Sequence, residues 1–292
     1  MQTREQFLKN RREGIGGSDV GAIIGVNPWK TPLDVYLEKT DPDIITEDNP
    51  AMKRGRKFEK YVLEEYEDFN QVELETNLEM VRHKDYPFLL GNIDAKIKGT
   101  NILVEAKTVG GMRWNDEITI YYKAQIAHYA NITNCDYVDV AVLFGFNYKQ
   151  YTYYRDYKFE EKIQQEAIDF WNNHVLKKVP PAPANEKDIS KLYHTSNNCA
   201  LEASDDLRSL IDKLIQLEQD NKESSNKISE IKLQIMNAMG EHESLIHHEK
   251  KLISWKSSIR RGFNTELFKE KHPDLYNEFI KVTNTRTFRI YQ

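Results

Sequence analysis

The sequence predicts a mixed α/β (α+β) domain, with a central β-sheet flanked by helices, followed by an extension of helices and a β-hairpin. Strand-like runs, in which apolar residues alternate with polar ones or predominate, lie at 71–82, 93–97, 102–106, 137–145 and 150–157. Runs with the apolar spacing of a helix lie between and around them, at 52–69, 117–133 and 159–178. Because strands and helices alternate along the chain, we expect the helices to cover a sheet.

Length and composition are those of a globular protein without a membrane span. The chain has 292 residues, 30% of them charged, and its mean hydropathy is −0.70. No apolar run approaches the roughly 18 residues that cross a bilayer. The N-terminal sequence MQTREQFLKNRREG lacks the apolar core of a secretory signal. We therefore expect a cytoplasmic protein with no membrane partner.

Cysteine content and net charge limit the possible classes further. The two cysteines, Cys135 and Cys199, exclude a disulfide framework and a four-cysteine metal site within one chain, and they fit a reducing cytoplasm. The formal net charge of −5 does not by itself indicate a nucleic-acid binder. Acidic residues on one face can nevertheless coexist with a groove lined by basic residues.

A proline-bearing segment predicts the domain organisation. VPPAPANEKD, at 179–188, has the composition of a stiff linker with partly polyproline structure. We therefore expect a core at 1–178, a linker at 179–190 and an extension at 191–292. We expect the extension to contact a partner protein or a neighbouring subunit.

The extension contains one long amphipathic segment at 203–240. Its apolar residues recur at helical spacing: Leu207, Leu210, Leu214, Leu217, Ile228, Ile231 and Ile235. The segment fits one long helix or a helical hairpin broken near 221–226. Its apolar face fits a coiled-coil surface or, as the default, docking on the chain's own core. Beyond it we expect a hairpin at 244–257, helices at 264–271 and 273–281, and a strand-like end, TRTFRIYQ.

Near the N-terminus, the glycine-rich sequence GIGGSD precedes a short apolar run. Ser18 is placed to cap a helix that ends before Gly25. Free backbone N–H groups at such a helix start, together with Arg11 and Arg12, can hold a phosphate. The alternative is an ordinary glycine-rich turn with a capping serine. Thr31 and Pro32 begin the next helix, and we expect Trp29 and Trp114 to be packing residues.

The hairpin at 93–106 places two carboxylates opposite each other. Gly99-Thr100 suits a two-residue type II′ turn, and with that turn Asp94 lies directly opposite Glu105. Lys107 lies on the same face as Glu105 because strand side chains repeat every two residues. Opposed carboxylates repel each other unless a cation lies between them, and Mg²⁺ with water and phosphate ligands suits such a pair.

Three residues on neighbouring helices are further candidates. Glu59 lies beside the apolar stripe of its helix, where it can equally be a surface ion-pair partner. Gln125 and Tyr129 are four residues apart and share a helix face, with His128 on a neighbouring face. Taken alone, a glutamine or histidine on such a helix is usually structural.

The pattern Asp94…Glu105-x-Lys107 is the minimum for metal-assisted phosphodiester cleavage. The carboxylates can hold Mg²⁺, which polarises the phosphoryl oxygen and acidifies its bound water. The carbonyl oxygen of Ala106, between the two active side chains, is placed to be a further ligand. Lys107 can orient the attacking water and stabilise charge on the phosphate.

Several motifs, in order, carry a resemblance to a known family. GIGGSDVGAIIGVNPWKTPLDVYLEKT, GRKFEKYV, LLGNIDAKI, ILVEAKT and AQIAHYANIT resemble the lambda-exonuclease or YqaJ-like viral recombinase family of the PD-(D/E)xK nuclease superfamily, over about residues 10–155. The resemblance implies a restriction-endonuclease-like core. It also implies a processive 5′→3′ exonuclease that acts on double-stranded DNA ends. Such enzymes release 5′-mononucleotides and leave a 3′ single-stranded tail for a single-strand annealing protein.

The resemblance assigns roles to the matching residues. It makes Asp94, Glu105 and the carbonyl of Ala106 ligands of Mg²⁺, or of Mn²⁺, and makes Lys107 the catalytic lysine. Gln125 then completes the catalytic site, and Glu59 lies near a second metal position. The residues implied to grip the 5′-phosphate and the DNA are Arg11, Ser18, Asn92 and Tyr129. Asn92 stands where a small hydroxyl residue can help to bind phosphate, and it can still donate a hydrogen bond.

The resemblance also bears on assembly and source. Several relatives form ring-shaped homotrimers that encircle DNA, and the family belongs to phages and prophages, which act in the bacterial cytoplasm. Two alternatives remain: a structure- or sequence-specific DNA endonuclease on the same core, and a catalytically inactive DNA-binding or annealing-partner scaffold. All the expected acidic and lysine positions are filled, which favours an enzyme.

Overall fold

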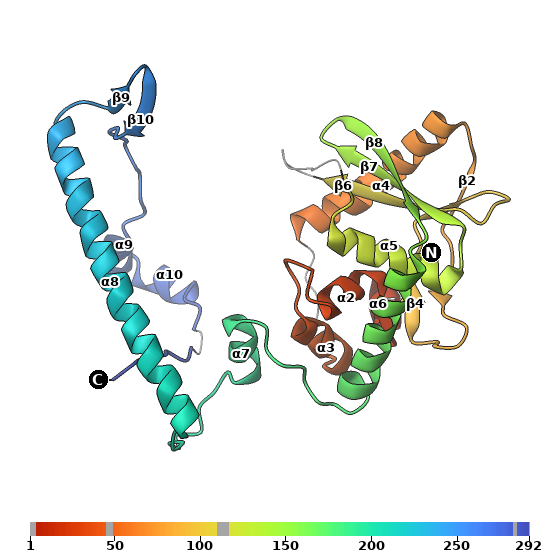
Figure 1. Ribbon diagram of the computed structural model, residues 1–292, viewed down its shortest axis with the longest axis horizontal. Coiled ribbons are helices and arrows are strands. Elements are labelled where there is room, and N and C mark those ends of the chain that lie inside the picture. Colours follow the sequence, from red (N-terminus) through yellow and green to blue (C-terminus); the bar gives the residue numbers. More distant parts are fainter. Residues whose placement is uncertain (1–3, 45–48, 110–116, 283–284, 292) are drawn as a thin grey trace. The chain divides into compact units, whose positions relative to one another are not determined.

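The computed structural model describes residues 4–44, 49–109, 117–282 and 285–291. It divides into two compact units, Met1–Leu192 and Tyr193–Gln292 (Figure 1). Trp114 lies outside the described residues. In the described part of the chain, no helix is both long enough and apolar enough to cross a membrane.

The first unit is built on a five-stranded mixed sheet, as the sequence predicts. Its order is β2-β5-β6-β7-β8, with the strands at Leu74–Thr76, Ala95–Ile97, Leu103–Val109, Tyr137–Phe144 and Asn147–Tyr154. β6 and β7 run parallel, and the other neighbours run antiparallel. A smaller sheet, β1-β4-β3, joins Ile15–Gly16, Leu89–Gly91 and Val81–Arg82.

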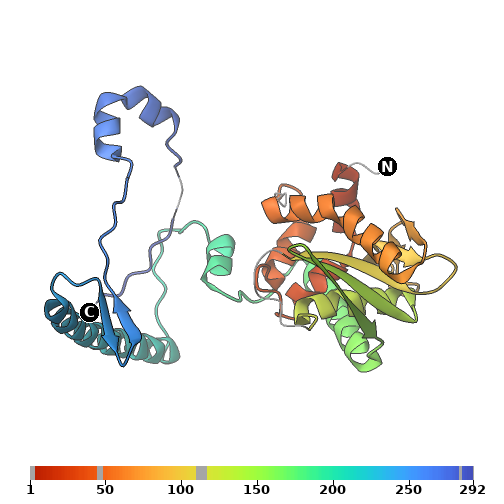
Figure 2. The ribbon, with the colours of Figure 1, turned by 90° about the horizontal axis from the view of Figure 1, so that it is seen from above.

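Helices cover both faces of the large sheet (Figures 1 and 2). The larger core packs one face against helices at Gly17–Ile23 (α2), Pro32–Thr40 (α3), Ile120–Thr133 (α5) and Tyr157–Phe170 (α6), the last continuing as a π-helix at Trp171–Val175. The other face packs against α4 (Pro50–Asn70). Successive side chains of a strand point to opposite faces of the sheet. On β6, Leu103 therefore belongs to the larger core, and its neighbour Val104 belongs to the core against α4. A short helix, α1 (Arg4–Arg12), precedes these elements.

A buried hydrogen bond attaches α4 to the sheet. The Tyr66 hydroxyl donates to Oδ2 of Asp139 on β7 at 2.6 Å, and the Thr152 hydroxyl on β8 donates to Oδ1 at 2.6 Å. Both carboxylate oxygens of Asp139 are therefore satisfied, as burial requires. Since α4 also carries Glu59, this bond positions Glu59 relative to the sheet.

The predicted hairpin register is confirmed, but the predicted turn is wrong. Ala95 pairs with Val104, which is the register that sets Asp94 opposite Glu105. The turn, however, is closed by the Thr100 N–H, which donates to the Ile97 carbonyl at 3.1 Å. Gly99, with φ of 74°, is thus the third residue of the turn rather than the second.

Two local predictions near the sheets are also wrong. α2 is capped by Gly16, not Ser18, because the Asp19 carboxylate reaches back and accepts the Gly16 N–H at 3.1 Å. The segment 71–82, predicted as one strand, is divided between β2 and β3. Asn77, with φ of 57°, interrupts it.

The segment predicted as a linker is partly folded onto the first unit. Helix α7 (Glu186–Leu192) carries the buried Asp188, whose carboxylate accepts from the Thr31 hydroxyl and the Ala184 N–H, each at 3.0 Å. Lys191 forms an ion pair with Asp34 of α3. The first unit therefore extends to Leu192, beyond the expected core end at residue 178.

The second unit contains one long helix and a hairpin. α8 (Asp205–Met239) is a single 35-residue helix that is not broken near 221–226. β9 (Ser244–His247) and β10 (Lys250–Ser254) form the expected hairpin, followed by α9 (Thr265–Lys271) and α10 (Pro273–Glu278). The strand expected at the end of the chain is not present in residues 285–291.

Candidate active site

The hairpin of β5 and β6 and the helix α5 bring four predicted residues together, here called the carboxylate cluster: Asp94, Glu105, Lys107 and Gln125. Glu105 is only 2% exposed, and its Oε1 accepts from Lys107 Nζ and, at 2.8 Å, from Gln125 Nε2. Asp94 Oδ2 accepts the backbone N–H of Ala106 at 2.9 Å. The residues that the sequence places opposite each other therefore form one connected site.

Burial disfavours the charged forms of both carboxyl groups. Burial and the charge of Asp94 raise the pKa of Glu105 to about 8. Burial also raises the pKa of Asp94. Burial alone would lower the pKa of Lys107, but the charges of Glu105 and Asp94 outweigh it and raise that pKa, so Lys107 stays protonated. A further cation is therefore favoured at this site.

The carboxylate cluster fits a divalent cation that keeps open positions. Oε2 of Glu105 is buried and has no hydrogen-bond partner in the described structure, so a carboxylate oxygen is available as a ligand. Within the described residues, no three acidic, histidine or cysteine side chains lie close enough to enclose a metal. Mg²⁺ is typically held in this way, by one or two carboxylates with waters and substrate oxygens completing its shell.

Glu59 lies near this cluster, as the resemblance implies. It is half-buried on α4, and its pKa is raised first by burial and then by the charge of Asp94. The charge of Lys107 acts on it in the opposite direction. Glu59 thus belongs to the electrostatic environment of Asp94.

Gln125 joins the carboxylate cluster to the N-terminal segment. Its Nε2 donates to Glu105 and, at 3.1 Å, to the hydroxyl oxygen of Tyr129 one turn later on α5. Burial and the nearby carboxylates raise the pKa of Tyr129, so its phenol stays neutral and can donate. Gly17 packs on this ring: a Cβ atom there would lie 2.5 Å from Tyr129 Cε1. The absence of a side chain at Gly17 therefore lets α2 approach α5.

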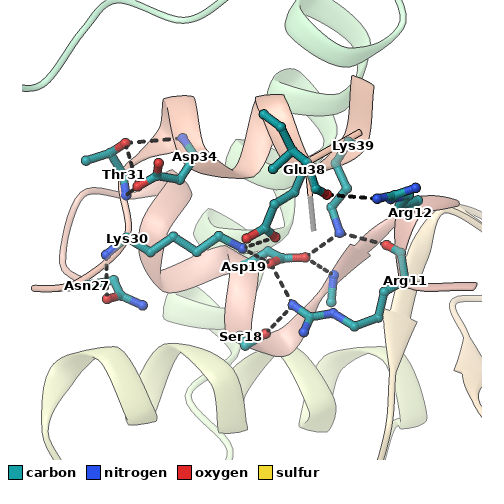
Figure 3. A network of polar contacts seen from close by, with 12 residues as sticks. Arg11, Arg12, Ser18, Asp19, Asn27, Lys30, Thr31, Asp34, Glu38 and Lys39 are labelled. Atoms are coloured by element: carbon teal, nitrogen blue, oxygen red, sulfur yellow. Dashed lines mark hydrogen bonds and ion pairs between the residues drawn. The ribbon is translucent and has the colours of Figure 1, made fainter. Parts of the chain in front are cut away.

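A second cluster surrounds Asp19, and the sequence analysis did not identify it (Figure 3). Asp19 has 0% exposure and accepts from Arg11 Nη2 at 3.2 Å, Lys30 Nζ at 2.9 Å and Lys39 Nζ at 2.7 Å. Arg11 Nη2 also donates to the Ser18 hydroxyl at 3.0 Å. We call these five residues the Asp19 cluster.

The charge of Asp19 holds this cluster together. Burial alone would raise the pKa of Asp19, but the charges of Lys30, Lys39 and Arg11 outweigh it and hold that pKa well below its ordinary value. Glu38 supplies a second anion, which accepts from Lys30 at 2.5 Å. Three cations against two anions leave the cluster with an excess positive charge, which suits an anionic ligand.

A cavity of about 870 Å³ opens beside the Asp19 cluster. Its lining includes Arg11, Ser18, Asn27, Trp29, Lys30 and Lys191. Trp29, predicted to be a packing residue, is 73% exposed and contacts Tyr121 edge to face, with ring centroids 5.1 Å apart. Arg11 and Ser18, two of the residues expected to grip phosphate, therefore border an open cavity. Its lining also holds three acidic residues, Asp34, Glu38 and Asp41.

The remaining candidates occupy different environments. Asn92 is half-buried in the segment between β4 and β5. His128 is buried and its Nε2 hydrogen-bonds the Leu90 carbonyl at 2.9 Å, and burial lowers its pKa to about 4, so it is a neutral structural residue as expected.

Comparison with known proteins places the chain in a family. The model of the YqaJ-like viral recombinase domain matches residues 6–136. The uncharacterized protein YqaJ of Bacillus subtilis (strain 168) is 31% identical to this chain. The alignment is 304 residues long and covers 99% of this chain and 94% of that protein. The chain belongs to the YqaJ-like viral recombinase family.

A solved structure shows the same fold as this YqaJ-like protein. LHK-Exo, an alkaline exonuclease from Laribacter hongkongensis solved in complex with dAMP, superposes with a TM-score of 0.50 at 14% identity. The match covers 65% of this chain and 98% of that one. At this identity, the likeness concerns the nuclease fold.

The Asp19 cluster yields a prediction about stability. Asp19→Asn should lower the free energy of unfolding by about 3 kcal/mol at pH 7, because three buried or half-buried cations lose their shared anion. The folded pKa of Asp19 is depressed, so this stabilisation is complete above the ordinary pKa of 3.8 and is lost as the pH falls below it. Denaturant titrations of both proteins from pH 7 to pH 3 measure the difference.

Glu64→Gln is the matched control. Glu64 forms an exposed ion pair with Lys60 on α4, so its loss should cost less than about 1 kcal/mol. An Asp19→Asn variant as stable as the Glu64→Gln variant would show that Asp19 does not organise the cluster.

Proposed function

We propose that the chain is a divalent-metal-dependent exonuclease that degrades one strand of linear double-stranded DNA in the 5′→3′ direction. The observation that carries the proposal is the connection between two sites. The carboxylate cluster suits phosphodiester cleavage, and Gln125, Tyr129 and Gly17 join it to the cavity at Arg11 and Ser18. Membership of a viral recombinase family and the fold shared with an alkaline exonuclease support the same reaction class.

In the carboxylate cluster, Asp94, Glu105 and the Ala106 carbonyl would hold Mg²⁺ or Mn²⁺, with Glu59 near a second position. A divalent ion bound there supplies positive charge to the phosphate in the transition state and lowers the pKa of the attacking water. Lys107, which stays protonated, stabilises negative charge that develops on the phosphate and orients the water. Gln125 holds Glu105 in place through its hydrogen bond to Oε1.

At the Asp19 cluster, Arg11 and Ser18 would bind the 5′-terminal phosphate. The excess positive charge of the cluster favours a phosphate monoester, which carries more negative charge than a phosphodiester. Asn92 and Tyr129 would contact the DNA between the two sites. A terminus held at Arg11 while the carboxylate cluster cuts nearby makes 5′-mononucleotides the product and a 3′ single-stranded tail the remainder.

The proposal extends to partners and setting. The 3′ tail is the substrate of a single-strand annealing protein, which we take as the functional partner in phage-type recombination. A ring-shaped trimer around the DNA would keep the nuclease on its substrate between cuts. The bacterial cytoplasm, where a phage or prophage protein meets DNA ends, is the proposed location.

The catalytic role of Lys107 is testable by nucleotide release. With Mg²⁺, the wild-type protein should release acid-soluble nucleotide from linear duplex DNA, and excess EDTA should stop the release. Lys107→Ala should reduce the rate by about 100-fold or more, because a charge that stabilises the transition state is lost. Lys177→Ala, at an exposed lysine of the same unit, is the control and should leave the rate unchanged.

Two outcomes contradict the proposal, one with linear DNA and one with circular DNA. Equal release by wild type and Lys107→Ala excludes the assigned chemistry. Nicking of covalently closed circular DNA, which offers no end, would instead favour the endonuclease alternative.

End selection is testable with two linear duplexes that differ only in a 5′-phosphate or a 5′-hydroxyl. The wild-type protein should degrade the phosphorylated duplex faster. Ser18→Ala should reduce that preference by about tenfold, because one hydrogen bond to a charged group contributes about 1.5 kcal/mol. Ser229→Ala, at an exposed serine of α8, should keep the wild-type preference, and an unchanged preference in Ser18→Ala would remove Ser18 from the phosphate site.

A further inference from the structure

The long helix α8 of the second unit carries a heptad repeat that neither proposed site uses (Figure 1). With Leu207 at position a, the a and d positions are Leu207, Leu210, Leu214, Leu217, Asn221, Ser224, Ile228, Ile231, Ile235 and Ala238. All are apolar except the adjacent Asn221 and Ser224 at the centre. A repeat of this length, with apolar a and d positions, is typical of a coiled-coil seam.

The seam is largely open to solvent. Leu210 is 63% exposed, Leu217 55% and Ile231 57%. Leu214 and Ile235 are half-buried. A helix of 35 residues with a largely exposed, mostly apolar stripe is stabilised by covering that stripe.

We propose that α8 pairs with α8 of a second copy of this chain as an antiparallel coiled coil. In an antiparallel pair, each a residue faces a d residue of the other helix. The repeat is self-complementary in that arrangement about a centre between Lys222 and Glu223. Leu207 then faces Ala238, Leu210 faces Ile235, Leu214 faces Ile231 and Leu217 faces Ile228.

The two polar positions of the seam also match each other. In the same register, Asn221 faces Ser224 of the second copy, and by symmetry Ser224 faces its Asn221. An amide and a hydroxyl can hydrogen-bond, whereas either one opposite a leucine would leave a buried polar group unsatisfied. The central polar layer therefore selects this register, as a single polar a position does in other coiled coils.

Charges beside the seam favour the antiparallel direction. Position g of one helix contacts position g of the other in an antiparallel pair, which brings Asp220 to Lys227 of the second copy. A parallel pair instead brings each g residue to the e residue of the next heptad. In that arrangement Lys213 attracts Glu218 of the second copy, but Lys227 repels Lys232 of the second copy. Only the antiparallel pair has attraction without a like-charge contact.

This pairing does not depend on the proposed nuclease activity. It joins chains in twos through the second unit, whatever assembly the first units form. In the antiparallel register, the second copy places a matching residue opposite every a and d residue of α8. For this reason we propose pairing with a second copy rather than docking of α8 on its own chain.

Disulfide trapping tests the pairing in the full-length chain. In a Cys199→Ser background, the only native cysteine left is the buried Cys135. The double variant Leu210→Cys with Ile235→Cys should form a covalent dimer under mild oxidation, because the two positions face each other. Neither single variant should do so. The two cysteines of one helix are too far apart to bond within a chain, at about 1.5 Å rise per residue.

A matched control uses two outward-facing positions at the same depth along the helix. Asp212 and Leu233 both occupy position f, so Asp212→Cys with Leu233→Cys should give no covalent dimer. Far-UV circular dichroism checks that every variant keeps its helix content. No dimer from the Leu210→Cys, Ile235→Cys variant overturns the pairing, and a dimer from either single variant overturns the antiparallel direction.

Discussion

The opposition of Asp94 and Glu105 across one hairpin is the constraint on which the first unit depends. The register of β5 and β6 sets two carboxyl groups together where burial raises the pKa of both, and the charge of Asp94 raises that of Glu105 further. Such a pair costs stability unless a positive charge compensates it. Lys107 supplies one such charge. In the proposed function, a divalent cation supplies another.

The Asp19 cluster has the opposite arrangement of charges. There a single buried carboxylate holds three cationic side chains, and it depends on them for its own ionisation. Arg11 and Ser18 of this cluster line a cavity. α5 connects the two clusters because Gln125 reaches Glu105 and Tyr129 packs on Gly17. One helix thus sets how far Arg11 and Ser18 lie from the carboxylate cluster.

The carboxylate cluster was predictable because its residues follow local periodicity. A two-residue strand repeat places Asp94, Glu105 and Lys107, and a four-residue helix spacing places Gln125 beside Tyr129. The Asp19 cluster was not predictable, since its cations come from separate elements and Lys30 and Lys39 resemble surface lysines in sequence. The same limit applies to α7: only tertiary contact shows that Asp188 is buried beside Thr31. The predicted cap at Ser18 was wrong for a similar reason. The Asp19 side chain accepts the Gly16 N–H, so the helix begins after Gly16.

We propose that Asp94 and Glu105 together hold a divalent cation, and calorimetric titration with Mn²⁺ or Mg²⁺ tests this binding without any substrate. The wild-type protein should bind the ion. The double variant Asp94→Asn with Glu105→Gln, which keeps shape but removes both charges, should lose at least tenfold in affinity, roughly the loss that follows from removing even an outer-shell partner. Unchanged affinity in the double variant would contradict the account.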